Sequence, residues 1–419
     1  MRADLKIRAR EMDESDPLRS FRDLFYVPTV PGGDDIIYLV GNSLGLQPKS
    51  VHSYVSLELE KWRRLGVAGH FEGDEPWLNY HESVCPAVAA LVGGLPHEVV
   101  VMNSLTVNLH LMMATFFQPS GTRSRIVMEA NAFPSDRYAV ESHLRFRGLS
   151  PDDHLIELNP RSGEDILRTE DILRVMEDQT DQISLVVLGG LNYYSGQVLD
   201  MEVISRTGQT LNIPVGFDLA HAVGNVPLHL HEWGCDFAVW CSYKYLNAGP
   251  GAIAGAFIHE RHARDSTKNR LAGWWGHDPA TRFEMPPTFA ASESADGWQV
   301  SGPPILQLAA LRASLEIFET AGMDALHEKR RRLSAFMREV LADVEGPFRI
   351  ITPSAEASAG CQLSIFFERH SREIFEALEA NGVACDYREP NVVRIAAVPL
   401  YNSYSDVVRF GEILERVCI

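Results

Sequence analysis

The sequence lacks any long apolar run, and no segment approaches the roughly 18 uninterrupted apolar residues of a membrane-spanning helix. It has few cysteines, six in 419 residues, and none of them forms a Cys-x-x-Cys pair. A chain of this size without a disulfide framework is typical of a reducing compartment, so we expect a cytoplasmic protein. The first residues mix charges of both signs and include no apolar stretch of the secretory-signal type, which favours the same location.

Positive charge is also scarce. Lys and Arg number 38 against 56 Asp and Glu, which gives a formal net charge of −18. Because nucleic acids and anionic membranes bind positive surfaces, we expect neither as a partner. The one basic run, residues 329–332, lies in a helical pattern and is predicted to be a solvated helix face. No Walker A or G-x-G-x-x-G segment occurs.

Short β-branched runs alternate with helix-length patterns through the middle of the chain. We predict six strands there, from the segments HEVVVMN, SRIVMEA, DQISLVVLGG, NIPVGFD, CDFAVWCSY and GAIAGAFIH. Strands separated by helices favour an α/β fold with a mostly parallel sheet covered on both faces. After residue 305 a long helix and a strand–helix–strand pattern predict a smaller α+β unit. We therefore place a large domain at residues 66–305 and a small domain at 306–419, with residues 1–65 contributing to the small domain.

Three polar signals fall where these strands are predicted to end. Lys244 follows CDFAVWCSY, Asp218 closes NIPVGFD, and the turn at residues 103–106 begins a helix. Taken singly, they fit a lysine that reaches solvent, an aspartate that caps a helix, and an ordinary N-cap. Together they supply an amine for an imine bond, a carboxylate for a pyridinium nitrogen and a helix N-terminus for a phosphate. Those are the parts of a pyridoxal 5'-phosphate site.

Longer segments around these residues resemble the kynureninase family. The similar segments, in family order across residues 38–404, are GNSLGLQP, MNSLTVNLHL, AFPSDRYA, VGFDLAHAVGN, DFAVWCSYKYLNAGPGAIAGAFIHERH, LAGWWGH, PPIL and VRIAAVPLYNS. The resemblance implies a fold-type I pyridoxal phosphate architecture, similar to class V aminotransferases, with a mostly parallel seven-stranded sheet and a smaller α+β domain. It also implies a homodimer with active sites near the interface.

The activity implied is that of a hydrolase acting on a carbon–carbon bond in a ketonic substance. Such an enzyme converts L-kynurenine or 3-hydroxy-L-kynurenine to an anthranilate and L-alanine, in tryptophan catabolism on the route to NAD. The resemblance implies no metal. It implies that Lys244 holds the cofactor and moves the Cα proton, and that Asp218 pairs with the pyridine nitrogen. Tyr243 would bind phosphate and donate a proton late in the reaction.

The resemblance assigns further contacts to the cofactor and the substrate. His221 would lie beside the cofactor and orient the Asp218 carboxylate, and Arg394 would clamp the substrate α-carboxylate. Trp274 would reach a phosphate across the dimer interface. The other cofactor contacts implied are Leu105, Thr106, Phe133, Pro134, Ser135, Asp136, Gly189 and Gly302. The other substrate contacts implied are Ser43, His70 and Ser301.

Two positions depart from the patterns of relatives. His70 and Ser301 resemble the animal-type enzymes, which favour the 3-hydroxylated substrate, but those enzymes have asparagine where this chain has Gly302. Because losing a polar contact costs about 1–3 kcal/mol, we expect only a lean toward 3-hydroxykynurenine, with mixed specificity. At Gly189, some relatives have a serine.

Three other functions stay open at this stage. A cysteine desulfurase or an aminotransferase would share the Asp and Lys, but a desulfurase needs a mobile cysteine, and Cys361 and Cys385 are predicted in ordered elements. A metal hydrolase is suggested by 15 histidines, but HERH (259–262) and HLHEW (229–233) lack the spacing of a zinc helix. A non-catalytic protein on the same fold is opposed by the complete set of motifs.

Overall fold

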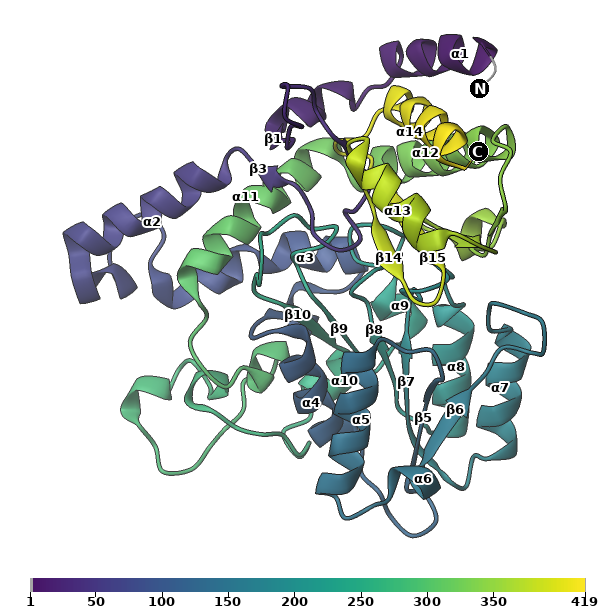
Figure 1. The fold of residues 1–419 in the computed structure, drawn as a ribbon. Helices are drawn as coiled ribbons and strands as arrows, with labels where there is room; N and C mark the ends of the chain where they lie inside the picture. Colours follow the sequence, from purple (N-terminus) through teal and green to yellow (C-terminus); the bar gives the residue numbers. More distant parts are fainter. Residues whose placement is uncertain (1–2, 419) are drawn as a thin grey trace.

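A seven-stranded sheet forms the centre of the larger region of the molecule (Figure 1). The computed structural model describes residues 3–418. The strands lie in the order β4 (Val99–Val101), β10 (Gly255–Ile258), β9 (Phe237–Trp240), β8 (Val215–Asp218), β7 (Ile183–Gly189), β5 (Arg125–Glu129) and β6 (Leu155–Leu158). The four pairs from β9 to β6 are parallel, whereas β10 is antiparallel to both of its neighbours.

The mostly parallel α/β sheet predicted from the sequence is therefore confirmed. The edge strand β6 is absent from the six strands predicted in the sequence. Its residues, Leu-Ile-Glu-Leu, follow the short helix α6 (Pro151–His154) without a turn signal. So short a run, with one polar residue, has too little periodicity to identify as a strand.

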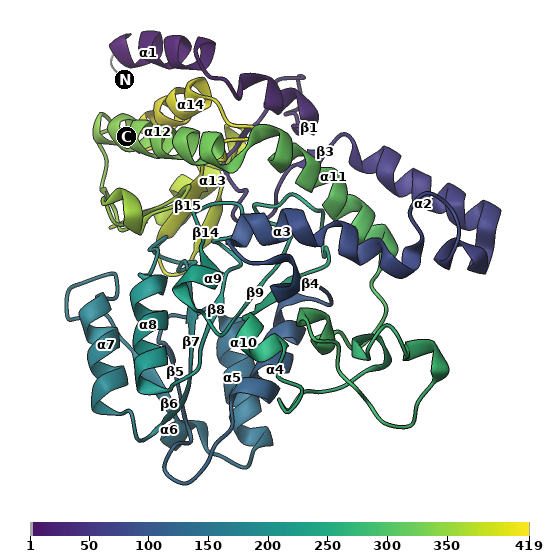
Figure 2. The same ribbon diagram turned by 180° about the vertical axis from the view of Figure 1, so that it is seen from behind.

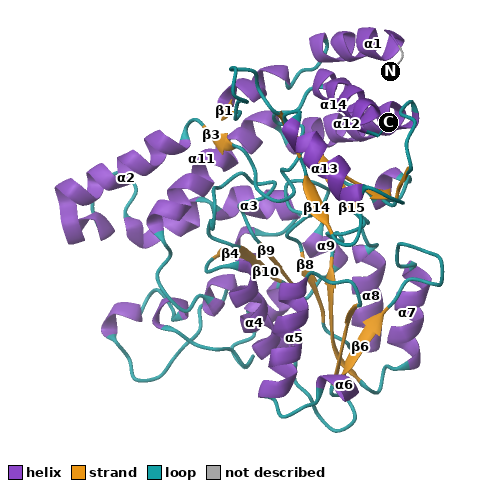
Figure 3. Ribbon diagram, viewed as in Figure 1, coloured by secondary structure: helices purple, strands orange, loops and turns teal. Residues whose placement is uncertain are grey.

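Successive residues of the strands face opposite sides of the sheet. In β7, Leu185 and Val187 pack in one apolar cluster, while Val186 and Leu188 pack in another. Because both faces are covered, the strands are apolar throughout rather than alternating. One face is covered by α4 (Leu105–Phe116) and α5 (Pro134–Phe146), and the other by α3 (Cys85–Val92), α7 (Thr169–Asp178) and α8 (Met201–Leu211) (Figure 3).

The smaller region is built on a four-stranded antiparallel sheet. Its order is β11 (Phe348–Ile350), β12 (Gln362–Phe367), β15 (Val392–Ala396) and β14 (Asp386–Arg388). It shares one apolar cluster with residues of α12 (Met323–Ala342), α13 (Ser371–Ala380) and α14 (Tyr404–Val417).

The N-terminal segment packs in this smaller region. The buried residues Leu5 and Ala9 of α1 (Ala3–Glu14) belong to its apolar cluster, and β2 (Ile37–Tyr38) pairs in parallel with β13 (Val383–Ala384). α1 and α14, which come from opposite parts of the sequence, lie side by side (Figure 2). Leu18, Phe25 and Leu46 belong instead to the apolar cluster of the larger sheet, so residues 1–65 contact both regions. The predicted division of the chain, with boundaries near residues 65 and 305, stays a prediction.

Two helices extend to one side of the molecule. They are α2 (Val51–Leu65) and α11 (Ile305–Ala321), which pack along each other (Figures 1 and 2). The remaining short elements are β1 (Phe25–Tyr26), β3 (Gln47–Pro48), α9 (Leu230–Trp233) and α10 (Glu260–Ala263). Among residues 3–418, no helix combines the length and the apolar character that a membrane span needs.

The basic run at residues 329–332 lies in α12, but only half of it is solvated. Lys329 and Arg330 are buried, and the two arginines that follow are exposed. Nζ of Lys329 lies 2.7 Å from Oδ2 of the buried Asp16, and Arg330 donates to a backbone carbonyl. The prediction of a solvated face is therefore wrong for Lys329 and Arg330. At 3.6 residues per turn, four consecutive helical residues cannot all share one face.

Candidate active site

A cavity lies where four parallel strands end. Glu129 closes β5, Gly189 closes β7, Asp218 closes β8, and Lys244 lies in the turn after β9. The cavity encloses about 130 Å³, many times the roughly 10–15 Å³ that one water molecule needs. In open α/β sheets, ligands bind at the carboxyl ends of strands, so this is the expected place for a ligand.

Most of the predicted cofactor contacts line this cavity. They are Leu105, Thr106, Phe133, Ser135, Asp136, Gly189, Asp218, His221, Tyr243 and Lys244. Within the described chain, seven of the predicted site residues do not line it. These are Ser43, His70, Pro134, Trp274, Ser301, Gly302 and Arg394.

The Lys244 amine faces the cavity. Its Nζ lies 3.0 Å from Nε2 of His221 and 5.8 Å from the centre of the Phe133 ring. Burial, followed by the positive charge of Lys244, lowers the pKa of His221 well below its ordinary value. The imidazole is therefore neutral and can accept a hydrogen bond from the lysine amine.

No hydrogen bond joins His221 to the Asp218 carboxylate among residues 3–418, so the orienting role of His221 stays a prediction. Oδ1 of Asp218 instead accepts a hydrogen bond of 2.7 Å from the backbone N–H of Ala220. Asp218 begins a tight turn that brings this N–H back onto its own side chain. Nε2 of His221 pairs with the lysine, and its Nδ1 is buried without a hydrogen-bond partner in residues 3–418.

Three buried carboxyl groups lie at the cavity: Asp218, Asp136 and Glu129. Burial, and then the charge of Asp218, raises the pKa of Asp136 well above its ordinary value. The direction of this shift favours Asp136 as the protonated member of the Asp136–Asp218 pair. Because a buried charge needs a positive partner, a protonated ring nitrogen beside Asp218 would satisfy this carboxylate.

The N-terminus of α4 forms the other end of the cavity. Ser104 precedes the helix, but its side chain makes no capping hydrogen bond. The N–H groups of the first turn are then available to an anion, which the helix dipole also favours. Oγ1 of Thr106 lies 2.8 Å from Oγ of Ser135, so two hydroxyls flank this helix start. An amine, a buried carboxylate and an anion site around one cavity fit pyridoxal phosphate.

Arg394 lies behind the cavity rather than in it. The side chain is buried, and its Nε donates a 2.6 Å hydrogen bond to Oδ1 of Asp386. Nη1 donates to the backbone oxygen of Tyr193, also at 2.6 Å. Tyr193 lines the cavity, so this residue separates the Arg394 guanidinium from the cavity. A substrate carboxylate would have to share a guanidinium that is already paired.

Ser43 lies in a loop packed directly on the lysine turn. The N–H of Gly45 donates to the backbone oxygen of Tyr243 at 2.8 Å. A Cβ at Gly45 would lie 2.4 Å from the backbone oxygen of Lys244, so only glycine allows this approach. The segment 41–45, GNSLG, also fits a G-x-S-x-G pattern. No helix follows it directly, as a nucleophile elbow requires.

The other predicted contacts lie in exposed 3₁₀ helices, in or directly after a bend, or at a helix start. His70, Trp274, Ser301 and Gly302 are exposed, and Nε1 of Trp274 donates to a backbone oxygen in its own loop. Pro134 is the first residue of α5, where its fixed φ suits the helix start. The structure of one chain does not bring these residues to the cavity, and their roles stay predictions.

Glu129 and Tyr193 line the cavity, and the sequence analysis missed both. Glu129 closes a predicted strand, as Asp218 does, so the same strand-end criterion identifies it. Tyr193 lies in a loop and carries no comparable signal. A Cβ at Gly189 would lie 3.0 Å from Oε1 of Glu129. The serine of some relatives would therefore press on this carboxyl group.

Replacing Glu129 with glutamine should reduce the pH dependence of stability in the cofactor-free protein. Burial raises the pKa of Glu129 from 4.5 to about 7, so the folded chain binds this proton more tightly than the unfolded chain. The stabilisation is complete below the unfolded value and is lost as the pH rises through the folded value. By pH 8 this loss is about 3 kcal/mol.

Urea unfolding at pH 5 and pH 8 measures this effect. E129Q should lose less stability over that interval than the unsubstituted chain. The control E319Q, at an exposed position on α11, should match the unsubstituted chain. Equal losses in all three proteins would contradict the assignment.

Comparison with known proteins identifies close relatives. The family model of the kynureninase C-terminal domain matches residues 326–414. The kynureninase of Myxococcus xanthus (strain DK1622) is 52% identical over 408 residues, which cover 97% of this chain and 96% of that protein. The kynureninase of Koribacter versatilis (strain Ellin345) is 50% identical over 403 residues, covering 96% and 95%.

Solved structures share the fold at lower identity. The apo structure of a cysteine desulfurase from Thermococcus onnurineus NA1 has a TM-score of 0.76 at 17% identity, covering 91% of this chain and 94% of that chain. A C-DES variant with glycine covalently linked to its PLP cofactor has a TM-score of 0.78 at 15% identity, covering 94% and 99%. These similarities confirm the predicted fold-type I architecture.

Proposed function

The chain belongs to the kynureninase family, and from this premise we propose which of its residues carry out the reaction. The enzyme uses pyridoxal 5'-phosphate and hydrolyses L-kynurenine, its 3-hydroxy derivative, or both, to an anthranilate and L-alanine. One observation supports the residue assignments above all. Lys244, Asp218 and the open N-terminus of α4 surround a single cavity.

A cysteine desulfurase activity on the same fold is not favoured. The desulfurase structures share the fold at low sequence identity, whereas kynureninases match nearly the whole chain at about half identity. Burial also raises the pKa of the Cys361 thiol to about 12 and that of Cys385 still further. A buried thiol with a raised pKa is a poor nucleophile.

Each residue at the cavity has a distinct task in the proposed mechanism. When bound, pyridoxal phosphate supplies a ring that accepts electrons from the substrate carbon atoms. The Asp218 carboxylate would hold the proton on the ring nitrogen, and Phe133 would cover the ring. Thr106, Ser135 and the first N–H groups of α4 would bind the phosphate.

Proton movement falls to Lys244 and Tyr243. Nζ of Lys244 takes the proton from the substrate Cα early in the reaction and returns a proton to this carbon at the end. The neutral His221 keeps the lysine amine oriented. Burial raises the pKa of Tyr243 far above its ordinary value, so its hydroxyl holds a proton throughout the neutral range. That proton is delivered to the three-carbon product after the anthranilate leaves.

Kinetics on both substrates, side by side, test the proposed function. The purified enzyme with added cofactor should release fluorescent anthranilate from L-kynurenine and 3-hydroxyanthranilate from the hydroxylated substrate, each with an equal amount of alanine. We propose mixed specificity with a lean toward the hydroxylated substrate. Release of neither anthranilate, together with sulfur release from cysteine, would contradict the function.

Replacing Gly302 with asparagine should increase the preference for 3-hydroxykynurenine. A Cβ at this position would lie 3.5 Å from the Trp275 ring, an ordinary contact, so the chain has room for a side chain. The added amide supplies a polar partner for the substrate hydroxyl, worth about tenfold in the ratio of kcat/KM values. The control G302A fills the space without the amide and should leave the ratio unchanged. An equal ratio in G302N and G302A would refute the role of the amide.

We propose a homodimer formed through one apolar patch. It consists of Leu57, Trp62, Val67, Phe71, Trp274, Phe283 and Met285, all exposed. The Phe71 and Phe283 ring centres are 6.2 Å apart, and those of Trp274 and Phe283 are 5.5 Å apart. These ring contacts join Phe71, which follows α2 in the chain, to the segment that contains Trp274 and Phe283. A contiguous exposed apolar patch is typical of an interface. Trp274 within it fits a contact to the partner's cofactor.

Replacing Phe71 with glutamate should weaken the dimer at least about tenfold, because the interface would then bury an unpaired charge. Sedimentation velocity at several protein concentrations measures the change. The control F146E, at another exposed phenylalanine on α5, should leave the dimer intact. A monomeric unsubstituted chain, or a dimer unchanged by F71E, would contradict the proposed interface.

We also propose a cytoplasmic location. All six cysteines are free in the structure. Free thiols are typical of proteins in a reducing compartment.

A further inference from the structure

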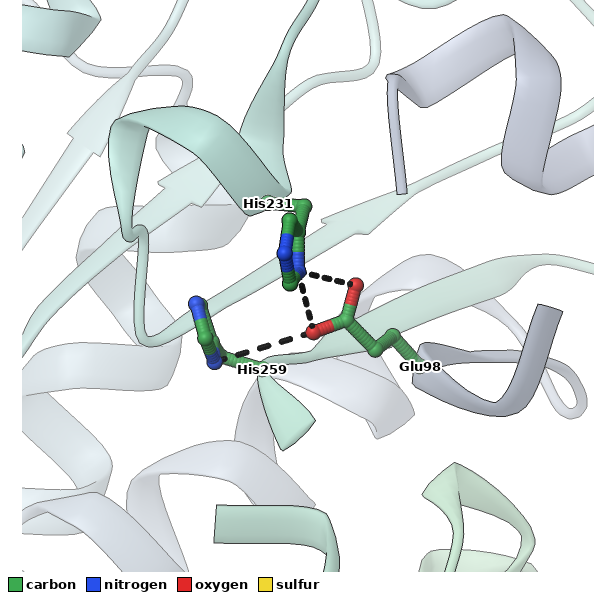
Figure 4. Close-up of side chains that lie close together, drawn as sticks. All are labelled: Glu98, His231 and His259. Carbon is green, nitrogen blue, oxygen red and sulfur yellow. Dashed lines mark hydrogen bonds and ion pairs between the residues drawn. The ribbon is translucent and has the colours of Figure 1, made fainter. Parts of the chain in front are cut away.

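A second cluster of chemically active side chains lies at the end of the sheet opposite the cavity. It consists of Glu98, His231 and His259 (Figure 4). Glu98 is the last residue of the short 3₁₀ helix η4 (Pro96–Glu98) that leads into β4, and His259 directly follows β10. Because β4 and β10 are antiparallel, the start of one meets the end of the other. His231 lies on α9, which precedes β9.

The two imidazoles turn the same nitrogen toward one carboxylate. Oε1 of Glu98 lies 3.0 Å from Nδ1 of His231 and 3.6 Å from Nδ1 of His259. The rings are nearly parallel, with an interplanar angle of 18° and centres 5.1 Å apart (Figure 4). Tetrahedral zinc ligands at metal distances of about 2.0–2.1 Å stand about 3.3 Å from each other. The two nitrogen–oxygen separations lie on either side of this value.

The Glu98 carboxylate has no lysine or arginine as an ion-pair partner among residues 3–418. The carboxylate is fully buried, and among residues 3–418 its ion-pair partners are the two histidines. It accepts hydrogen bonds from the backbone N–H groups of Glu260 at 2.7 Å and Leu95 at 2.9 Å, which fix its position between the two imidazoles. Buried charges in proteins are paired or bind metal ions.

The hydrogen bonding of His259 provides an independent indication of a cation. Its Nδ1 accepts a hydrogen bond of 3.3 Å from the backbone N–H of Arg261, at the start of α10. Nδ1 therefore carries a lone pair, not a hydrogen. That lone pair and Oε1 of Glu98 lie 3.6 Å apart with no hydrogen between them. A cation between them would replace this unfavourable approach with two bonds.

We propose that Glu98, His231 and His259 bind a divalent ion of the zinc class. Two imidazole nitrogens and one carboxylate oxygen are a ligand set that zinc prefers, and solvent would complete the tetrahedron. The His231 side chain is one-third exposed, at 33%, which gives the ion a way in. Because the ligands come from three separate segments, the ion ties η4, α9 and the turn after β10 together. Its place at the opposite end of the strands separates it from the reaction.

Zinc titration of the holoenzyme by calorimetry tests the site. We expect saturable binding of one zinc ion per chain, and cobalt in its place should give the visible absorption of a tetrahedral complex. H231A and H259A should each weaken zinc binding at least about tenfold. Both are preferable to a Glu98 substitution, because Glu98 also accepts hydrogen bonds from two backbone N–H groups, which a substitution would leave without this partner.

H229A is the matched control. His229 lies two residues from His231, but its ring packs on Trp233 rather than on the cluster. Zinc binding that is weakened in the two cluster variants and retained in H229A supports the site. Absence of saturable binding by the unsubstituted holoenzyme, or equal binding by all four proteins, overturns it. The titration measures zinc directly, so its result does not depend on the proposed catalytic roles.

Discussion

Replacing Lys244 with alanine should abolish kynurenine turnover and remove the absorbance band of the bound cofactor. The substitution removes the amine that anchors the cofactor and, with it, the base at the substrate Cα. Proton transfer by a positioned side chain alone contributes about 10²–10⁴-fold, so we expect kcat to fall at least about 10³-fold. Anthranilate fluorescence measures turnover, and the visible spectrum of the purified variant measures the cofactor.

The exposed Lys49 offers a matched control. Its amine lies over the Tyr26 ring, 5.6 Å from the ring centre, and is not among the residues that line the cavity. K49A should therefore keep both the absorbance band and the rate. A K244A enzyme with an unchanged spectrum and normal turnover would show that another group holds the cofactor.

Replacing Asp218 with asparagine should lower kcat by about 10²–10⁴-fold while the chain still folds. Asparagine keeps an oxygen for the Ala220 N–H but carries no charge to hold a proton on the ring nitrogen. Folding should tolerate the change, because the charge of Asp218 is itself buried and contributes to the raised pKa of Asp136. Steady-state kinetics and urea unfolding of the cofactor-free variant measure the two effects separately.

Asp136 provides the comparison within the same carboxyl pair. Because the raised pKa of Asp136 favours its protonated form, D136N should remove little charge and should reduce kcat much less than D218N. Similar losses in the two variants, or a D218N enzyme of nearly normal activity, would contradict the assignment of the charged carboxylate.

The features that the sequence predicts well are local ones. The apolar strand runs mark the central strands, and residues at their carboxyl ends, such as Asp218 and Lys244, follow from strand position alone. Glu129 obeys the same rule, because it closes β5. The edge strand β6 is too short for its period to be recognised.

The features that the sequence does not predict depend on contacts between distant segments of the chain. The sequence places Arg394 on a strand, but not its bonds to Asp386 and to the backbone of Tyr193. Nor does it show that Lys329 of the basic run pairs with Asp16 in the interior. The predicted role of Trp274 requires a second chain, which no local pattern describes.

The histidine cluster shows the same limit. Neither HLHEW nor HERH has, by itself, the histidine spacing of a zinc helix. Strand pairing supplies what spacing cannot. The register that sets Phe257 opposite Val99 brings His259 beside Glu98, and α9 adds His231.

Borohydride reduction of the holoenzyme tests the central claim most directly. The treatment fixes the cofactor to whichever amine holds it, and mass spectrometry of a digest then locates the modified residue. We predict a pyridoxyl group on the peptide that contains Lys244 and on no other lysine. A modification at another lysine, or none after complete reduction, would contradict the account.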